Sequence, residues 1–313
     1  MSSKIMLVGE PMGLFIAQSE GPLETVRQFS TAVAGAEFNV AVGLSRLGHR
    51  VGYLTKLGKD PFGLQITNTM RKNQIDTSLI SFSEERTTGM MLKSKVSTGD
   101  PEIFYYRKNS AASSIGRQDI DRIDFSEYKF LHMTGIFPAL SQTTLEASVY
   151  LMQKARANGL TIFFDPNLRP QLWGDQEKMV KAMNELALSS DYFMPGVKEG
   201  TILSGQTTPE SIADYYIQRG IANIIIKVGE KGAYAATKQE QCYVPGFHVD
   251  KVVDTVGAGD GFAAGVISAV MEGLPIAGAV SRGNAIGAIQ VMSVGDNDGL
   301  PTREFLQQFM SPS

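Results

Sequence analysis

Short apolar runs alternate along the chain with longer stretches in which apolar residues recur at helical spacing. The short runs have the length of buried strands, and the longer stretches have the periodicity of helices packed on a core. Such an alternation predicts an α/β fold, with a mostly parallel sheet covered by helices on both faces. The expected strands cover residues 4–9, 51–57, 129–133, 161–165, 191–194 and 222–228, and the expected helices cover 37–48, 61–73, 142–158, 175–188 and 258–273.

Glycines stand where several of the predicted helices should end. Glycine adopts the left-handed backbone conformation that commonly terminates a helix, so these positions predict C-terminal caps. The glycines concerned are Gly48, Gly159, Gly220 and Gly273.

Two regions break the alternation, because residues 12–34 and 88–108 have strand character and little helical content. A cluster of turn-forming residues at 97–101 divides the strands of the second region. We expect both regions to form a small β-sheet lid that projects from a single domain covering residues 1–313. Ordinary edge strands of the main sheet are the alternative.

Composition narrows the class of protein. Of the 313 residues, 43% are hydrophobic and 19% are charged, with a net charge of −3, which is typical of a packed globular protein and argues against a nucleic-acid surface. There is no apolar run of the roughly 18 residues that a membrane-spanning helix needs, and the run Ile5–Val8 is too short for a signal peptide. The single cysteine, Cys242, excludes an intramolecular disulfide. We therefore expect a cytoplasmic protein with no nucleic-acid or membrane partner.

The segment from Asp254 to Gly265 carries the strongest chemical signal. A glycine-rich turn opens a helix there, and free N–H groups at a helix N-terminus favour an anion such as a phosphate. Asp260 would be repelled by such an anion unless it accepts a proton from an attacking hydroxyl, which is what phosphoryl transfer requires. The alternative is that Asp260 only caps the helix.

Four segments together resemble the ribokinase-like (PfkB) family of carbohydrate kinases. They are Ala34–Ala41 running on to Gly48, Leu57–Gly63, Lys227–Gly232 and Asp254–Gly265, in the family's order and across nearly the whole chain. The resemblance implies a Rossmann-like sheet with a β-lid that closes over the sugar, and ATP with Mg²⁺ as the phosphate donor. It agrees with the fold predicted from periodicity.

The resemblance also implies roles for individual residues. Asp260 corresponds to the catalytic base, and Gly257, Ala258 and Gly259 correspond to the anion hole for the transferred phosphate. Sugar contacts are implied at Gly35 and Asn39, and nucleotide contacts are implied at Asn167, Lys227, Gly229, Lys231, Gly232 and Asn284. Glu199 would organise hydrated Mg²⁺, although the family's asparagine is Gly196 here, and a monovalent cation such as K⁺ would lie near Asp254.

Two arginines indicate the class of sugar. Arg107 and Arg169 follow predicted strands, and a planar guanidinium suits a carboxylate better than a neutral hydroxyl. The first strand is followed by Glu10, whereas neutral-sugar members place an aspartate shortly after that strand. These segments resemble those of kinases that act on 2-keto-3-deoxygluconate. That resemblance implies acid contacts at Tyr105, Arg107 and Arg169, and a hydroxyl contact at Asp296. Contacts of Arg107 and of the segment Asn167–Arg169 with ATP phosphates are the alternative.

Other functions stay open from the sequence alone. A fructokinase-like enzyme for a neutral ketose would keep Asp260 and the same fold, and would differ in its lid residues. A catalytically inactive sugar sensor on the same fold would be expected to lose Asp260 or the glycine-rich turn, and both are present. Because an exposed lid sheet has unpaired edges, we also expect a homo-oligomer.

Overall fold

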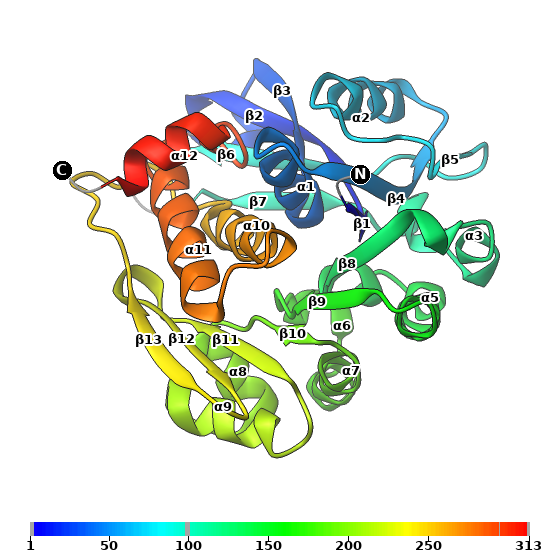
Figure 1. The fold of residues 1–313 in the computed structure, drawn as a ribbon. Helices are drawn as coiled ribbons and strands as arrows, with labels where there is room; N and C mark the ends of the chain where they lie inside the picture. Colours follow the sequence, from blue (N-terminus) through cyan, green and yellow to red (C-terminus); the bar gives the residue numbers. More distant parts are fainter. Residues whose placement is uncertain (1–2, 98–100, 294, 312–313) are drawn as a thin grey trace.

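A long twisted sheet runs through the computed structural model, which describes residues 3–97, 101–293 and 295–311 (Figure 1). Within these residues its strands lie in the order β13-β12-β11-β10-β9-β8-β1-β4-β5. All neighbours from β11 to β5 are parallel, whereas β12 and β13 are antiparallel additions at one edge. The strands are β1 (Lys4–Val8), β4 (Arg50–Gly58), β5 (Ile80–Ser83), β8 (Tyr128–Thr134), β9 (Thr161–Asp165), β10 (Tyr192–Phe193), β11 (Asn223–Lys227), β12 (Gly232–Thr237) and β13 (Gln241–Pro245).

Alternate side chains of the central strands pack into two separate hydrophobic cores, one on each face of the sheet. On β1, Met6 and Val8 join one core, while Ile5 and Leu7 join the other. Because both faces are buried, most residues of the central strands are apolar, and several of the charged ones, such as Lys4 and Asp165, stand at strand ends. The first core is covered by α3 (Arg117–Ile120), α4 (Ile136–Ala139), α5 (Gln142–Ala157), α6 (Pro170–Trp173), α7 (Gln176–Leu188), α8 (Val197–Ser204) and α9 (Pro209–Ile217), and the second by α1 (Ala36–Arg46), α2 (Pro61–Lys72), α10 (Ala258–Met271), α11 (Ile276–Gln290) and α12 (Arg303–Met310).

The strands and helices predicted from periodicity are confirmed, with boundaries that differ by up to about two residues. The four glycines predicted to end helices, at positions 48, 159, 220 and 273, have positive φ angles of 84°, 72°, 104° and 78°. Strands β5, β12 and β13 were not predicted. The edge strands β5 and β13 carry mixed polar and apolar residues, and β12, which lies between β11 and β13, is short and rich in small residues. No helix in the described ranges is long and apolar enough to cross a membrane.

A separate four-stranded sheet stands over one end of the main sheet (Figure 1). It has the strand order β3-β2-β6-β7, and a small core of its own formed by Met12, Leu14, Ala34 and Met91. The two segments that broke the alternation therefore build their own sheet rather than edge strands of the main one. Residues 98–100 of the expected turn cluster lie outside the described residues. The strands are β2 (Met12–Glu20), β3 (Phe29–Ala34), β6 (Met90–Lys95) and β7 (Ile103–Tyr106).

Helices α10 and α11 pack backbone to backbone in the second core. A Cβ atom on Gly265 would lie 2.7 Å from the Cα atom of Gly283, and a Cβ atom on Gly283 would lie 3.0 Å from the ring of Phe262. Larger residues at these two positions would push the helices apart. This close packing fixes the position of α10, whose first turn carries Asp260.

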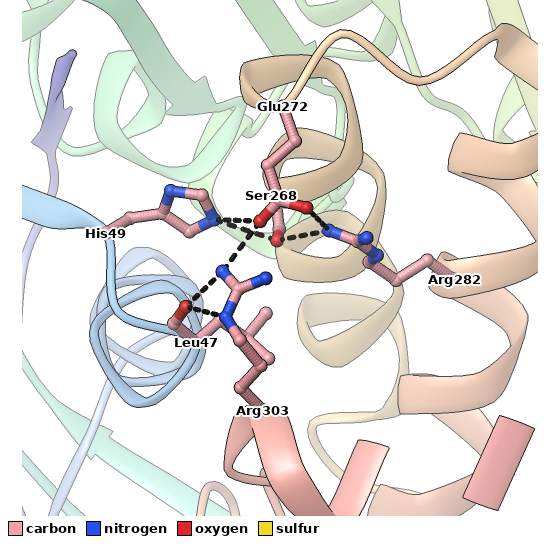
Figure 2. A network of polar contacts seen from close by, with 6 residues as sticks. All are labelled: Leu47, His49, Ser268, Glu272, Arg282 and Arg303. Atoms are coloured by element: carbon pink, nitrogen blue, oxygen red, sulfur yellow. Dashed lines mark hydrogen bonds and ion pairs between the residues drawn. The ribbon is translucent and has the colours of Figure 1, made fainter. Parts of the chain in front are cut away.

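A network of polar contacts surrounds Glu272, just after the C-terminal end of α10 (Figure 2). Arg282 of α11 and Arg303 of α12 donate to its two carboxylate oxygens at 2.8 Å and 2.6 Å. His49, which follows α1, contacts the hydroxyl of Ser268 at 2.8 Å. Burial lowers the pKa of His49 to about 4, so its ring is neutral near pH 7. The network therefore joins the helices of this layer at the end of α10 opposite to its first turn.

Candidate active site

Polar side chains gather at the carboxyl ends of the parallel strands, where ligands bind in open α/β sheets. Asp165 is the last residue of β9 and Lys227 is the last residue of β11, and their side chains form an ion pair of 2.5 Å. Asp165 also accepts a hydrogen bond from the backbone N–H of Asn167 at 3.0 Å. The side chain of Asn167 lies 3.5 Å from Asp260, so the strand ends and the first turn of α10 belong to one site.

The first turn of α10 follows a glycine that has a left-handed backbone. Gly257 has a φ angle of 78°, and a Cβ atom there would lie 2.2 Å from the carbonyl oxygen of Asp296. Within the described part of the chain, the N–H groups of Gly259 and Asp260 donate to no acceptor. The first turn therefore offers free backbone donors at the positive end of the helix dipole, as the sequence predicted for an anion site.

The carboxylate of Asp260 is held by asparagines from distant segments. Asn39 of α1 donates to Asp260 Oδ2 at 2.8 Å. Asn297 in turn donates to the Oδ1 atom of Asn39 at 3.0 Å. Because Asn39 Oδ1 accepts this bond, its Nδ2 group must face Asp260. The resemblance implied that Asn39 contacts the sugar. In the structure its side chain is hydrogen-bonded to Asp260, the expected base.

Burial raises the pKa of Asp260 from its ordinary value of 3.8 to about 7. The hydrogen bond from Asn39 acts in the opposite direction, because it stabilises the charged form. The nearby carboxylates of Asp165 and Glu37 raise the pKa further, and the guanidinium of Arg169 lowers it. A carboxyl group with a pKa near 7 is well matched to accepting a proton at physiological pH.

A cavity of about 730 Å³ opens beside the first turn of α10. Its walls include Ala258 and Gly259 of that turn, and apolar side chains such as Phe262 and Val291. Four of the six residues expected to contact a nucleotide line this cavity: Lys227, Gly229, Gly232 and Asn284. Lys231 and Asn167 do not line it. Lys231 is exposed, and Asn167 lies beside Asp260.

The amide of Asn284 is engaged in holding the wall of this cavity. Its Nδ2 group donates to the carbonyl oxygens of Val244 and Pro245, both at 3.0 Å. These two residues end strand β13, so Asn284 fixes that strand against α11. The side chain shapes the cavity in addition to lining it.

The two candidate arginines differ in their partners. Arg107 is buried and pairs with Glu10, at 2.6 Å from Nε and 2.5 Å from Nη2 to the same carboxylate oxygen. Arg169 forms no ion pair within the described residues, and its guanidinium donates only to the carbonyls of Leu168 and Asn167. Arg169 is therefore the more available of the two for an acidic ligand.

Two further residues expected to contact sugar, Tyr105 and Gly35, lie next to the pair formed by Arg107 and Glu10. The ring of Tyr105 is exposed on β7, 5.7 Å from the guanidinium carbon of Arg107. Gly35 is buried with a φ angle of 147°, and a Cβ atom there would lie 3.0 Å from the carbonyl oxygen of Glu10. Gly35 thus lets the start of α1 approach the end of β1 closely.

Both carboxylate oxygens of Asp254, the expected cation ligand, have a partner within the protein. Its Oδ1 atom accepts a hydrogen bond from the backbone N–H of Val256 at 3.0 Å. Its Oδ2 atom lies 3.2 Å from the ammonium nitrogen of Lys93, which is also 3.5 Å from Asp296. A second cation on Asp254 would stand beside the Lys93 ammonium, so the residues present do not fit a separate monovalent-cation site.

Glu199 has a structural role at the start of α8. Its two carboxylate oxygens accept the backbone N–H groups of Gly196 at 2.7 Å and Leu168 at 2.8 Å. The first bond caps α8, and the second fixes the loop that carries Asn167 and Arg169. The described residues contain no group of three or more acidic, histidine or cysteine side chains able to hold a metal ion. The expected role of Glu199 in organising hydrated Mg²⁺ stays a prediction.

Four residues of this site were not assigned a role by sequence reasoning: Glu10, Lys93, Asp165 and Asn297. Each one pairs with a group far away in the chain, and no local motif marks it. Asp165 gave a partial signal, since an acidic residue that ends an apolar strand reaches the ligand-binding edge of a parallel sheet.

Comparisons with known proteins show which proteins this chain is similar to. Residues 2–303 match the model of the pfkB family carbohydrate kinase. A 2-dehydro-3-deoxygluconokinase of Bacillus subtilis (strain 168) is 50% identical over 304 residues, which are 97% of this chain and 94% of that protein. A crystal structure of a PfkB protein from a Polaromonas species superposes with a TM-score of 0.89 at 43% identity, covering 97% of this chain and 99% of the other. An E. coli protein assigned as ribokinase II, in complex with ATP and Mg²⁺, superposes with a TM-score of 0.91 at 26% identity, covering 98% and 99%.

Proposed function

Because this chain belongs to the PfkB family of carbohydrate kinases, we propose that it phosphorylates the terminal hydroxyl of a sugar acid at the expense of ATP. The proposed substrate is 2-keto-3-deoxygluconate, also called 2-dehydro-3-deoxygluconate, and the product is its 6-phosphate. The observation that carries this proposal is the position of Arg169. Its guanidinium has no carboxylate partner in the described residues and is close enough to Asp260 to lower its pKa.

A sugar acid fits this arrangement better than a neutral ketose. Its carboxylate would pair with Arg169, while its far hydroxyl would reach Asp260. Glu10 follows β1, at the position where neutral-sugar enzymes carry a hydroxyl-binding aspartate. In this chain its carboxylate forms an ion pair with Arg107, so it is not available for a sugar hydroxyl. The name of the Bacillus subtilis relative supports the same substrate.

The proposed reaction takes place at the first turn of α10. Asp260 removes the proton of the substrate hydroxyl while the oxygen of that hydroxyl attacks the γ-phosphorus of ATP. The bond from that phosphorus to the bridging oxygen breaks, and ADP leaves. The N–H groups of Gly259 and Asp260, which have no acceptor within the described residues, would stabilise the negative charge that grows on the phosphoryl oxygens. The helix dipole adds to this stabilisation.

The cavity beside α10 is the proposed ATP site. Its apolar walls suit an adenine ring, and Lys227, the last residue of β11, contributes a positive charge to its lining. Mg²⁺ bound with the nucleotide would neutralise phosphate charge and would be held mainly by phosphate oxygens and water. The complex of the E. coli relative with ATP and Mg²⁺ supports this assignment.

The four-stranded sheet is proposed as the lid over the sugar. It carries Tyr105 and leads into Arg107, so its movement would complete the sugar site and exclude water. Among the described residues, its outer strands β3 and β7 each have one edge without a paired strand, and Phe104 and Tyr106 are 51% and 60% exposed. These features support a homo-oligomer formed through the lid. The single cysteine and the use of ATP agree with a cytoplasmic enzyme.

A substrate panel tests the proposal. ADP release with ATP and Mg²⁺ would be measured over 2-keto-3-deoxygluconate, fructose, ribose and tagatose. The expected result is turnover of the keto acid alone. Comparable turnover of fructose would contradict the sugar-acid site while leaving Asp260 and the fold in place.

A further inference from the structure

A buried ammonium group connects the lid sheet to the phosphate turn, which we define as residues 254–259. Lys93 lies on β6, and its side chain is 9% exposed. Its Nζ atom is 3.2 Å from Asp254 Oδ2 and 3.5 Å from Asp296 Oδ1, and these two side chains are 17% and 9% exposed. One positive charge therefore lies between two poorly solvated carboxylates that come from different segments.

The position of this ammonium matters for the shape of the turn. Asp254 is the first residue of the phosphate turn, and its other oxygen accepts the backbone N–H of Val256 at 3.0 Å. The carbonyl of Asp296 lies against Gly257, where a Cβ atom would come within 2.2 Å of it. Neutralising the two carboxylates thus supports the backbone on both sides of the glycine that opens α10.

We propose that Lys93 is a built-in cation, which replaces the separate monovalent cation that the family resemblance implies near Asp254. An ammonium ion and K⁺ carry the same charge and interact with carboxylate oxygens at similar distances. A free ion must be captured from solution, whereas the Lys93 ammonium is held by its own strand. Lys93 is a positioning residue, because it acts through Asp254 and Asp296 on the phosphate turn. The enzyme consequently works without K⁺.

The test compares three salts of equal ionic strength, namely KCl, NaCl and tetramethylammonium chloride. Turnover and melting temperature of the wild-type protein are expected to agree within about two-fold and about 2 °C across the three salts, since general screening is the same. Lys93→Met is expected to lose about ten-fold or more of its turnover in tetramethylammonium, because two carboxylates are left unneutralised. KCl should restore part of that turnover and raise the melting temperature of this variant.

Lys95→Met is the matched control. Lys95 lies two residues further along the same strand, but it is exposed and donates to the backbone carbonyl of Gln18. Its replacement should change neither turnover nor the response to salt. The double variant Lys93→Met/Asp254→Asn removes one charge of each sign, so it should fold in all three salts and gain nothing from KCl.

Two results would overturn the inference. One is a wild-type enzyme that KCl activates several-fold over tetramethylammonium. The other is a Lys93→Met variant whose melting temperature is the same in all three salts. Melting temperature is measured without a sugar, and turnover is measured on whichever sugar the panel selects. A wrong sugar-acid assignment therefore leaves this test intact.

Discussion

The side-chain amide of Asn39 donates a hydrogen bond of 2.8 Å to the carboxylate of Asp260, across 221 positions of the chain. This bond opposes the effect of burial, which raises the pKa of Asp260 to about 7. Since the base must be ionised to accept a proton, kcat/KM is expected to rise with pH through about 7 and then level off. The position of that rise reports directly on the environment of Asp260.

Asn39→Ala should move the acid limb of the pH profile to higher pH. Loss of a hydrogen bond to the charged form is expected to raise the apparent pKa by about one unit. The rate would then fall more below pH 7 than at about pH 9. A steady-state pH profile measures the shift, with the exposed Asn158→Ala as control. A uniform loss at every pH would mean that Asn39 acts only by shaping the site.

Asp260→Asn should abolish most of the turnover while preserving nucleotide binding. Removal of a general base costs about 10²–10⁴-fold in rate. The cavity that is expected to hold ATP includes Ala258 and Gly259 but does not depend on the Asp260 carboxylate. Single-turnover kinetics and ATP titration check the two effects separately. The exposed Asp214→Asn serves as control, and near-normal turnover of Asp260→Asn would exclude this residue as the base.

The same Asp260→Asn variant should be more stable than the wild type at alkaline pH. Because the folded-state pKa of about 7 exceeds the ordinary value of 3.8, the folded protein binds more protons between these two values. Stability contributed by Asp260 is therefore lost as pH rises from about 4 to about 7. The free energy of unfolding of Asp260→Asn should exceed that of the wild type by up to about 4 kcal/mol at about pH 8, and the difference should vanish near pH 4. Urea unfolding at the two pH values measures it, and an equal gain at both would contradict the assigned pKa.

Arg169→Ala should weaken the binding of the sugar acid much more than the binding of ATP. A charge-assisted pair with a carboxylate is worth about ten- to a hundred-fold in kcat/KM. Separate titrations of ATP and of the sugar acid distinguish the two ligands. Arg71→Ala on the exposed face of α2 is the control for loss of positive charge. An equal loss of affinity for both ligands would make Arg169 a nucleotide residue.

Glu272→Ala should lower stability without changing turnover. Glu272 accepts from Arg282 and Arg303 at the end of α10 remote from Asp260 (Figure 2). Its removal leaves two guanidinium groups without their carboxylate, at a cost of about 1–3 kcal/mol. Urea unfolding and kcat measure the two effects. A large loss of kcat with unchanged stability would show that the network controls the catalytic turn.

The sequence by itself determined the α/β class, six strands of the main sheet, five of the helices that cover it, and the phosphate turn. Each of these features is encoded within a short window. The periodicity of apolar residues decides which face of a strand or helix is buried, and a glycine that precedes a helix exposes its first N–H groups. For that reason Asp260 and the glycines around it were recognisable without coordinates.

Only the tertiary structure decided which charges are paired and which are available. Glu10 forms an ion pair with Arg107, which is 97 positions away in the chain, and Lys93 neutralises Asp254, which is 161 positions away. Sequence spacing treated Arg107 and Arg169 as equivalent, but packing leaves only Arg169 without a carboxylate partner among the described residues. A pairing between distant segments depends on how strands and helices dock. Burial then sets the strength of each pairing, because desolvated charges interact far more strongly than those in water.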